Sequence, residues 1–350
     1  MNETLSRTPR VPRGALGLAA GAAALLALAG GAQAQDYDLT IAVLPSPHTA
    51  YLKMAETIPD RIAEATGGKV KITLNDSLVG GPQIAAAVRD GRVPMSSALH
   101  TYLAAEEPRM GIFNLPGLID NMPEYAYVCE AFWCEDVDAI WLERWNAISL
   151  ANGAWCTQQL FSKEPIRTVE DFRNKKLRVH NPQTAALMDA LGAKPVPLAL
   201  SEVMPALERG IIDGLFTSTC YGHGQEYWRL APNVQNWGLG PINGWAILIN
   251  KEAWEEMPEE LREQVQAEMD RFEGEAIYGY YDFVREAMLD MESKGVTFWV
   301  APDSEKARIF DPQYTQPVYD SWYKRAEEVG FDGKAYIEKV RQTLGKDLLR

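Results

Sequence analysis

Hydrophobic and polar positions within residues 169–217 follow a strand-like and then a helix-like period, twice over. Leu177 and Val179 are apolar on either side of Arg178, as expected for a short strand that presents one polar position. The predicted elements, in order, are a strand around Arg178, a helix over 182–192, a strand over 194–198, a helix over 202–209 and a strand opened by Ile211 and Ile212. This order predicts a parallel sheet.

Turn and capping residues support these boundaries. Asn181 is a good N-cap and Pro182 suits the first helical position, while Ser201 is the N-cap expected for the second helix. In parallel sheets, ligands bind at the carboxyl ends of the strands, where Arg178 is expected. A guanidinium beside the free N–H groups of a helix start is suited to holding a carboxylate.

The rest of the chain also predicts an α/β protein. In the N-terminal half we expect strands over 38–44, 70–74 and 148–154, and helices over 51–66, 83–90 and 124–145. A strand over 244–250 is followed by a helical run over about 258–293, which is far longer than an average helix. Such a helix can span two domains as a spine. A strand over 296–300 and a helical tail complete the chain.

The N-terminus is typical of an export signal. Arg7, Arg10 and Arg13 precede an apolar stretch over 15–31, and the small-x-small triplet over 32–34 is a cleavage site. We therefore expect a signal peptide over 1–34, cleaved near Ala34, and a periplasmic mature protein. No later segment is apolar enough to cross a bilayer.

Charge excludes one class of partner. Removing the three Arg and one Glu of the signal peptide changes the formal charge from −14 to −16. A chain this acidic does not hold nucleic acid by neutralising phosphates, and anionic membrane surfaces repel it. An anionic ligand must therefore be held by local groups.

The cysteines suggest disulfides. The mature chain contains four of them, an even count that favours bridges in an oxidising compartment. Cys129 and Cys134 are close enough for a local bridge. Cys156 and Cys220 then either pair with each other or stay buried as small hydrophobic residues.

Sequence patterns of enzymes are missing. There is no G-x-S-x-G motif, and the phosphate-binding glycine motifs are absent. The histidines are scattered and lack metal-site spacing (His48, His100, His180, His223). We therefore predict no enzymatic activity, no catalytic residues, no cofactor and no protein-bound metal site. A periplasmic hydrolase is the less favoured alternative.

Several motifs in the expected order resemble those of the solute-binding proteins of tripartite ATP-independent periplasmic (TRAP) transporters, DctP type. They are YDLTIAV, EDFRNKKLRVHN, ALGAKPVPL, SEVMPALERGIIDG and ILINKEAWEEMPEELRE. The resemblance covers nearly all of the mature chain. It implies a two-lobed periplasmic binding protein fold, type II-like, with a long inter-domain spine helix. It places lobe I at 35–155 plus 244–285 and lobe II at 156–243 plus 286–350.

The same resemblance implies a function. Arg178 matches the arginine that pairs with the ligand carboxylate in this family, and the partners are a small organic acid and the small and large integral membrane subunits of a TRAP transporter. A binding protein that serves a sensor or an ATP-driven importer is the alternative. Stable membrane insertion after signal cleavage and nucleic-acid binding are not expected.

The sequence departs from the sialic-acid binders of the family. Their second arginine falls at or near Gln158, their first-lobe glutamate near Leu99, their asparagine near Thr217, and a nearby aromatic at Leu200. The expected ligand is therefore a smaller or more apolar acid, such as an aromatic or keto acid. Whether a metal ion bridges this ligand stays an open question. The candidate ligand-binding residues are Arg178, Gln158, Trp155, Thr217, Tyr221, His100, Tyr51 and Trp245.

Overall fold

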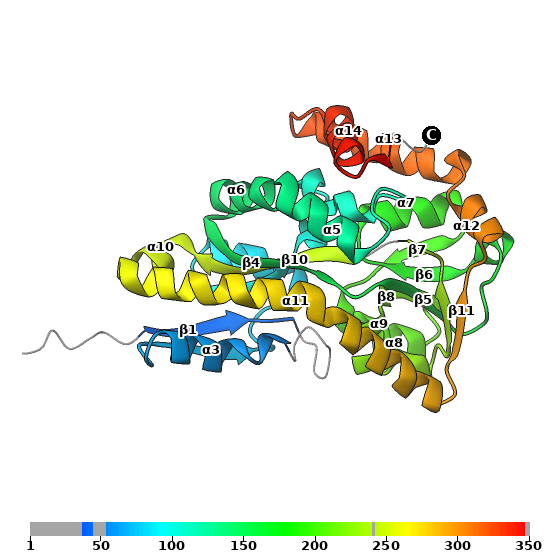
Figure 1. The fold of residues 1–350 in the computed structure, drawn as a ribbon. Helices are drawn as coiled ribbons and strands as arrows, with labels where there is room; N and C mark the ends of the chain where they lie inside the picture. The colour runs from blue at the N-terminus through cyan, green and yellow to red at the C-terminus, as the bar shows by residue number, and fades with distance from the viewer. Residues whose placement is uncertain (1–36, 45–53, 240–241, 347–350) are drawn as a thin grey trace, which may run out of the picture. The chain divides into compact units, whose positions relative to one another are not determined.

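The computed structural model describes residues 37–44, 54–239 and 242–346, with the side chains of residues 242 and 243 left out. The predicted signal peptide and the candidate residue Tyr51 lie outside these ranges. The described part of the chain forms two β-sheets flanked by helices (Figure 1).

The first sheet has the strand order β2-β1-β3-β10-β4. Its strands are β1 (Tyr37–Ala42), β2 (Val70–Asn75), β3 (Met95–Leu99), β4 (Ala147–Trp155) and β10 (Ile242–Asn250). β1 pairs in parallel with β2 and β3, whereas β10 is antiparallel to both β3 and β4. β10 comes late in the sequence and is inserted between two early strands, so that a distant segment closes this sheet.

The second sheet has the order β11-β9-β5-β8-β6-β7. Its strands are β5 (Gln158–Ser162), β6 (Lys176–Val179), β7 (Lys194–Pro197), β8 (Gly214–Ser218), β9 (Asn233–Asn236) and β11 (Thr297–Val300). β6 is parallel to both β7 and β8, which confirms the predicted parallel arrangement around Arg178. β5 is antiparallel to β8 and β9.

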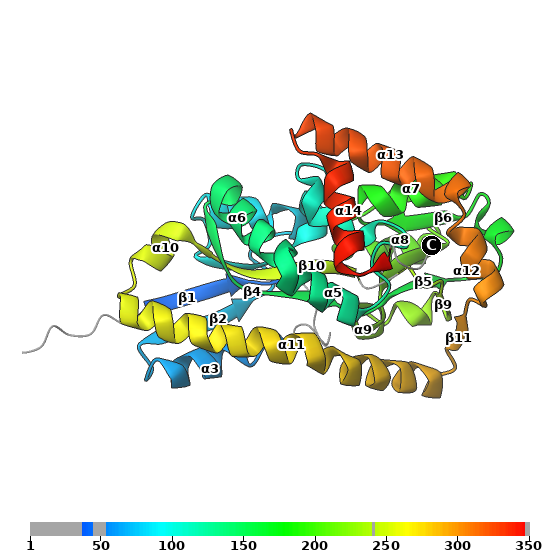
Figure 2. The same cartoon turned by 45° about the horizontal axis from the view of Figure 1, so that its top comes forward.

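Helices cover both sheets (Figures 1 and 2). The α-helices are α3 (Ile58–Ala65), α4 (Ile84–Arg89), α5 (Met122–Val128), α6 (Cys134–Trp145), α7 (Pro182–Ala190), α8 (Leu200–Glu208), α9 (Thr219–Gly224), α10 (Lys251–Glu255), α11 (Glu259–Ser293), α12 (Asp303–Ile309), α13 (Pro312–Glu328) and α14 (Gly333–Thr343). Short 3-10 segments are η1 (Gly81–Gln83), η2 (His100–Leu103), η3 (Pro108–Asn114), η5 (Val169–Phe172) and η6 (Tyr227–Arg229).

The boundaries of α7 follow the predicted signals. Asn181 accepts a hydrogen bond from the backbone N–H of Thr184 at 2.7 Å, which is the expected N-cap bond. Gly192 has a φ of +76°, a left-handed conformation that glycine adopts without strain. The predicted helix from Pro182 to this glycine is confirmed.

Three other boundary predictions were wrong. Ser201 is not an N-cap: α8 begins at Leu200, and the Glu202 carboxylate accepts the N–H of Ala199 at the helix start. The third strand begins at Gly214, because Ile211 lies exposed in a turn after the helix. The single helix expected over 124–145 is divided by a π-helical turn, η4 (Cys129–Trp133), between α5 and α6.

The long helix α11 spans 35 residues and contacts a strand of the first sheet and the helix that follows β8 of the second. It packs on α3 and β4 beside the first sheet and on α9 beside the second, as the views show (Figures 1 and 2). The predicted long helix is therefore present. The division of the chain into lobes at the predicted residues stays a prediction.

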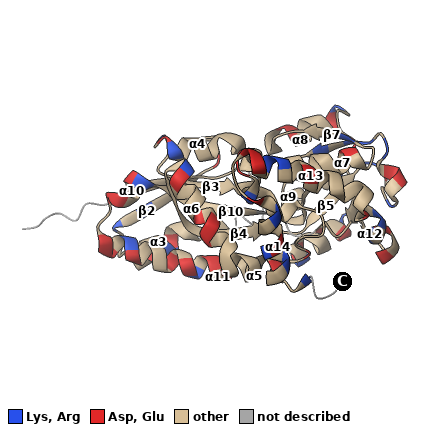
Figure 3. Cartoon of the chain, turned by 90° about the horizontal axis from the view of Figure 1, so that it is seen from above, with Lys and Arg blue, Asp and Glu red and all other residues tan. Residues whose placement is uncertain are grey.

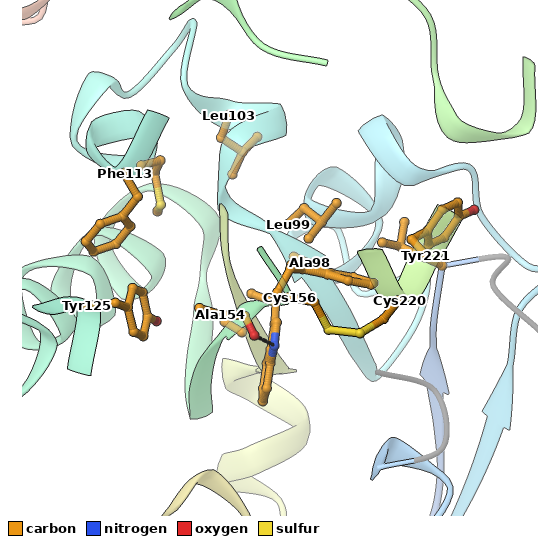
Figure 4. Close-up of a cluster of buried hydrophobic side chains, with 14 of the residues drawn as sticks. Ala98, Leu99, Leu103, Phe113, Tyr125, Ala154, Cys156, Cys220 and Tyr221 are labelled. Carbon is orange, nitrogen blue, oxygen red and sulfur yellow. Dashed lines mark hydrogen bonds between the residues drawn. A yellow bond between two sulfur atoms is a disulfide. The ribbon is translucent and has the colours of Figure 1, made fainter. Parts of the chain in front are cut away.

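Both cysteine pairs are bonded. Cys129–Cys134 closes a short loop around the π-helical turn, with a Cα–Cα distance of 4.7 Å. Cys156–Cys220 joins the segment after β4 to α9, with a Cα–Cα distance of 6.1 Å (Figure 4). The second bridge thus ties a segment next to the first sheet to a helix of the second.

Charged residues lie mostly on the outer helices, such as α10, α11 and α12, while the central strands contain few (Figure 3). Within the described residues, no helix is both long and apolar enough to cross a membrane. A charged residue inside this interior therefore stands out, and Arg178 is one of the largest fully buried side chains.

Candidate functional site

A cavity with an empty volume of about 340 Å³ lies where segments of the two sheets meet. Leu99 ends β3 and Tyr102 lies in η2, so these two come from the first-sheet side. Most of the other lining residues come from β5, β6, β8 and the segments that follow them. The full lining is Leu99, Tyr102, Trp155, Gln158, Arg178, His180, Leu200, Thr217, Ser218 and Tyr221.

Arg178 is held rigidly in this wall. It lies on β6 and is only 1% exposed. Its Nε donates to the carbonyl oxygen of Leu198 at 3.0 Å, and its Nη1 donates to that of Phe216 at 3.0 Å. These carbonyls lie just after β7 and within β8, the two strands that flank β6. The sheet therefore fixes the plane of the guanidinium.

The second terminal nitrogen of this guanidinium differs from the other two nitrogens. Nη2 of Arg178 is buried and has no hydrogen-bond partner among the residues that the structure describes. Burial lowers the pKa of Arg178 from its ordinary value, an effect partly offset by Tyr102 and other neighbours. A buried cation without a paired anion is costly, by several kcal/mol. The arrangement is therefore suited to an incoming anion.

Uncharged polar groups line the same cavity. The Gln158 Nε2 lies 3.3 Å from His180 Nε2, and the Gln158 Oε1 is buried without a hydrogen-bond partner in the described part of the chain. Register places Gln158 opposite Ser218 across β5 and β8. The Ser218 hydroxyl accepts the N–H of Tyr221 at 3.1 Å and so caps α9. These groups can bond a ligand without supplying a second fixed charge.

Aromatic rings form the remaining wall. Trp155 and Tyr221 meet edge to face with ring centroids 6.1 Å apart. Burial raises the pKa of Tyr102 and of Tyr221, so both hydroxyls stay neutral near pH 7. The Cys156–Cys220 bridge lies next to both Trp155 and Tyr221 in the sequence, and it fixes the two segments relative to each other (Figure 4). This wall of the cavity is thus apolar and rigid, and a disulfide joins its two segments.

Five of the predicted ligand-binding residues come together in this cavity: Arg178, Gln158, Trp155, Thr217 and Tyr221. Their role as ligand contacts stays a prediction. Tyr51 lies outside the described residues. Trp245 does not line this cavity. It lines a second, apolar cavity next to it, and its Nε1 donates to the Ala154 carbonyl at 3.3 Å.

His100 is also not among the residues that line this cavity. It is fully buried, with its ring 5.2 Å from that of Trp133 and 5.8 Å from that of Trp141. Burial lowers the pKa of His100 to about 3, so the imidazole is neutral at physiological pH. The structure therefore gives His100 a packing position.

Sequence reasoning missed several lining residues, among them Tyr102, His180 and Ser218. Tyr102 follows β3, a strand that the periodicity did not indicate because all five of its residues are buried. His180 and Ser218 directly follow β6 and β8, the strand ends at which ligands bind in parallel sheets. That rule would have found both.

Two other features bear on the site, the start of α7 and the placement of metal-ligating side chains. No residue over 181–184, the start of α7, lines the cavity, so the expected contribution of this helix N-terminus stays a prediction. Among the residues that the structure describes, no group of three or more His, Cys, Asp or Glu side chains is placed to hold a metal ion.

Comparison with known proteins gives the family. Residues 41–326 match the family described as bacterial extracellular solute-binding protein, family 7. A C4-dicarboxylate-binding periplasmic protein of Rhodobacter capsulatus is 24% identical over 92% of this chain and 97% of its own. A monocarboxylate 2-oxoacid-binding periplasmic protein of Nostoc is 26% identical over 60% of this chain, and the match spans 58% of the Nostoc protein.

A solved structure shows the same fold. The extracytoplasmic solute receptor of Bordetella pertussis that binds pyroglutamic acid superposes with a TM-score of 0.78, at 18% identity, over 87% of this chain and 98% of its own. The two-lobed α/β fold is thereby confirmed, and the family is one of binding proteins rather than enzymes. With a family match that covers most of its length, the chain belongs to the bacterial extracellular solute-binding proteins of family 7.

Proposed function

We propose that this protein captures a small monocarboxylic acid in the cavity around Arg178 and delivers it to the membrane subunits of a TRAP transporter. The observation that carries the proposal is that Arg178 lines the cavity while its buried Nη2 lacks a hydrogen-bond partner among the described residues. A carboxylate supplies both the charge and the acceptor that this nitrogen requires.

The named ligands of the compared proteins favour a small acid. Each compared protein whose ligand is named binds a carboxylic acid: a C4-dicarboxylate, a 2-oxoacid or pyroglutamic acid. This agreement supports an acid as the ligand here.

The charge of the lining favours one carboxylate over two. Arg178 is the sole Arg or Lys among the described residues that line the cavity. The facing groups are amide, imidazole, hydroxyl and apolar side chains, such as Gln158, His180 and Thr217. A second carboxylate would be desolvated without a paired cation, which costs free energy. The remainder of the ligand is therefore neutral, with polar atoms near Gln158 and an apolar part near Trp155 and Tyr221.

Export and delivery complete the proposal. The N-terminal pattern supports a signal peptide cleaved near Ala34, and the family is extracellular by description. Transport assays in reconstituted vesicles would distinguish the partner: uptake that requires this protein and proceeds without ATP supports a TRAP transporter. ATP-dependent uptake would support the ATP-driven importer instead.

The binding role of Arg178 is tested by calorimetry. A thermal-shift screen of keto, aromatic and sugar acids identifies the ligand, since a ligand at a hundred times its Kd adds about 2.7 kcal/mol to stability. Arg178→Ala should then weaken binding by about 2–5 kcal/mol, that is, about 30-fold to several thousand-fold, because one partner of a buried charged pair is lost. Exposed Arg209 offers a control, and Arg209→Ala should bind normally. Equal affinity of the Arg178 variant and the parent protein would refute the role of Arg178 as the anchor of the ligand carboxylate.

A further inference from the structure

A second cavity lies next to the first and is lined almost wholly by apolar groups. Its empty volume is about 350 Å³. Phe272, Ala276, Tyr280 and Phe283 line it at helical spacing along α11. The other lining residues are Met54, Ala154, Trp155, Cys156 and Trp245. No Asp, Glu, Lys or Arg is among the described residues of this lining.

Trp155 is the one described residue that lines both cavities. It ends β4, where side chains alternate between the two faces of the strand, and its neighbours Ala154 and Cys156 line the second cavity. The indole is 5% exposed and lies edge to face against Tyr221 of the first cavity. It is therefore a partition between a polar compartment, which contains Arg178, and an apolar one.

The partition is held by its ring contact with Tyr221 and by the fixed segments around it. The Cys156–Cys220 bridge fixes the backbone next to Trp155. In the second cavity, Trp245 is fixed by its hydrogen bond to the Ala154 carbonyl and by packing on Phe272, with the two ring centroids 6.0 Å apart. A side chain held this way is not expected to move aside for a ligand. We propose that Trp155 sets the upper length of the ligand, and that the cavity behind it accepts an aryl or alkyl group when the indole is removed.

This inference rests on the proposed function, since Arg178 would anchor the carboxylate of the longer acid. The distance that a ligand reaches from this anchor is limited by the indole. Removing the indole joins the two cavities, so that methylene and phenyl groups become buried among Phe272, Ala276 and Phe283. Each methylene that enters an apolar cavity contributes a gain of about fourfold in affinity.

The experiment is calorimetry with a graded series: benzoate, phenylacetate, 3-phenylpropanoate and 4-phenylbutanoate. Trp155→Ala should raise the affinity for the two longest acids at least tenfold over the parent protein, while benzoate gains nothing. Trp155→Leu, a milder truncation, should show a smaller shift of the same kind. Melting curves establish that each variant is folded.

A matched double variant identifies the compartment that is used. Ala276→Leu narrows the second cavity from α11 without lining the first. In the Trp155→Ala background it should cancel the gain for the long acids. A folded Trp155→Ala protein that shows no gain for any long acid, or a gain that survives Ala276→Leu, would overturn the partition.

Arg178→Ala in the Trp155→Ala background separates this inference from the proposed function. Loss of all binding in that double variant supports the anchor. A length-dependent gain that persists without Arg178 would leave the partition standing and refute the anchor instead.

Discussion

At the scale of single residues, Arg178 shows why an arginine rather than a lysine occupies this position. Its Nε and Nη1 donate to two backbone carbonyls, and a different nitrogen, Nη2, is buried without a hydrogen-bond partner among the described residues. A lysine ammonium is a compact charge on a flexible stem and lacks this planar fork. The strand neighbours thus orient the cation before any ligand arrives.

Gly153 is a second residue with a clear physical requirement. It pairs with Trp245 across β4 and β10, and a Cβ at this position would lie 2.2 Å from Trp245 Cζ2. We predict that Gly153→Ala lowers the free energy of unfolding by about 1–3 kcal/mol or more, because the indole or the strand must shift. Urea denaturation with an unchanged m-value measures this.

Gly274 provides the control for this substitution. It lies inside α11, and a Cβ there meets nothing within 4 Å. Gly274→Ala should raise stability by about 0.5–1 kcal/mol, because alanine loses less conformational freedom in a helix. Equal effects of the two substitutions would contradict the packing argument for Gly153.

At the scale of elements, α11 completes the outer edge of the first sheet. β4 is the last strand of this sheet, so its outer backbone groups have no neighbouring strand. Gln266 Nε2 donates to the Leu150 carbonyl at 3.1 Å, and the Glu273 carboxyl accepts the N–H of Asn152. The helix therefore satisfies and covers an edge that would otherwise be open to pairing.

Glu273 makes this contact sensitive to pH. Burial raises the pKa of Glu273 to about 7, with Asp138 and Asp270 acting in the same direction. Asp138, which accepts a bond from the Asn152 side chain at 2.9 Å, also has its pKa raised by burial. Between about pH 4.5 and 7 the folded state holds a proton on Glu273 that the unfolded state has lost. Stability should therefore fall as the pH rises through this window.

Glu273→Gln is predicted to remove the part of this pH dependence that Glu273 contributes, while Asp138 keeps its own part. The amide oxygen still accepts the Asn152 N–H, but no charge is buried. At pH 8 the variant should be more stable than the parent by on the order of 1–2 kcal/mol, discounted because the group is partly exposed. Near pH 4.5 the two should match. Thermal unfolding across this range measures the difference, and parallel curves would contradict it.

Elements with strong local signals could be predicted from the sequence, and others could not. α7 lies between Asn181 and Gly192, and α11 begins directly after Pro258. In both helices the boundary residues agree with the helical spacing of the apolar positions. β3 and β5 were missed because every residue in them is buried, which removes the alternation. The π-helical turn at Cys129 was missed because no local pattern distinguishes it from a continuous helix.

At the scale of the whole molecule, the C-terminal helices join parts of both sheets. α13 packs on α7, which follows β6, and also on η3 of the first-sheet side (Figure 2). Trp322 Nε1 donates to the Pro108 carbonyl at 2.9 Å, and Tyr319 Oη donates to that of Pro116 at 3.0 Å, both buried. The predicted tail of the second lobe therefore also contacts the first-sheet side.

Gly111 lies where η3, on the first-sheet side, closely approaches α7. A Cβ there would lie 2.6 Å from Gln183 Nε2 on α7 and 2.7 Å from Ala104 Cβ. We predict that Gly111→Ala weakens ligand binding several-fold without touching the ligand cavity, because it disfavours the arrangement in which Leu99 and Tyr102 face Arg178. Calorimetry with the ligand from the screen measures this.

Gly274→Ala again serves as the control, since it should leave the affinity unchanged. If Gly111→Ala lowered thermal stability but left the affinity at the parent value, the contact would have no part in bringing the walls of the cavity together.

The sequence by itself determined the parallel unit around Arg178, the long helix and the resemblance to a binding-protein family. These depend on local period, caps and motif order, which neighbouring residues carry. Only the tertiary structure decided that Tyr102 and Arg178 line one cavity, that His100 packs on two tryptophans and that Trp155 lines two cavities. These placements depend on contacts between segments far apart in the chain, because β10 enters the first sheet between β3 and β4. No local pattern encodes that insertion.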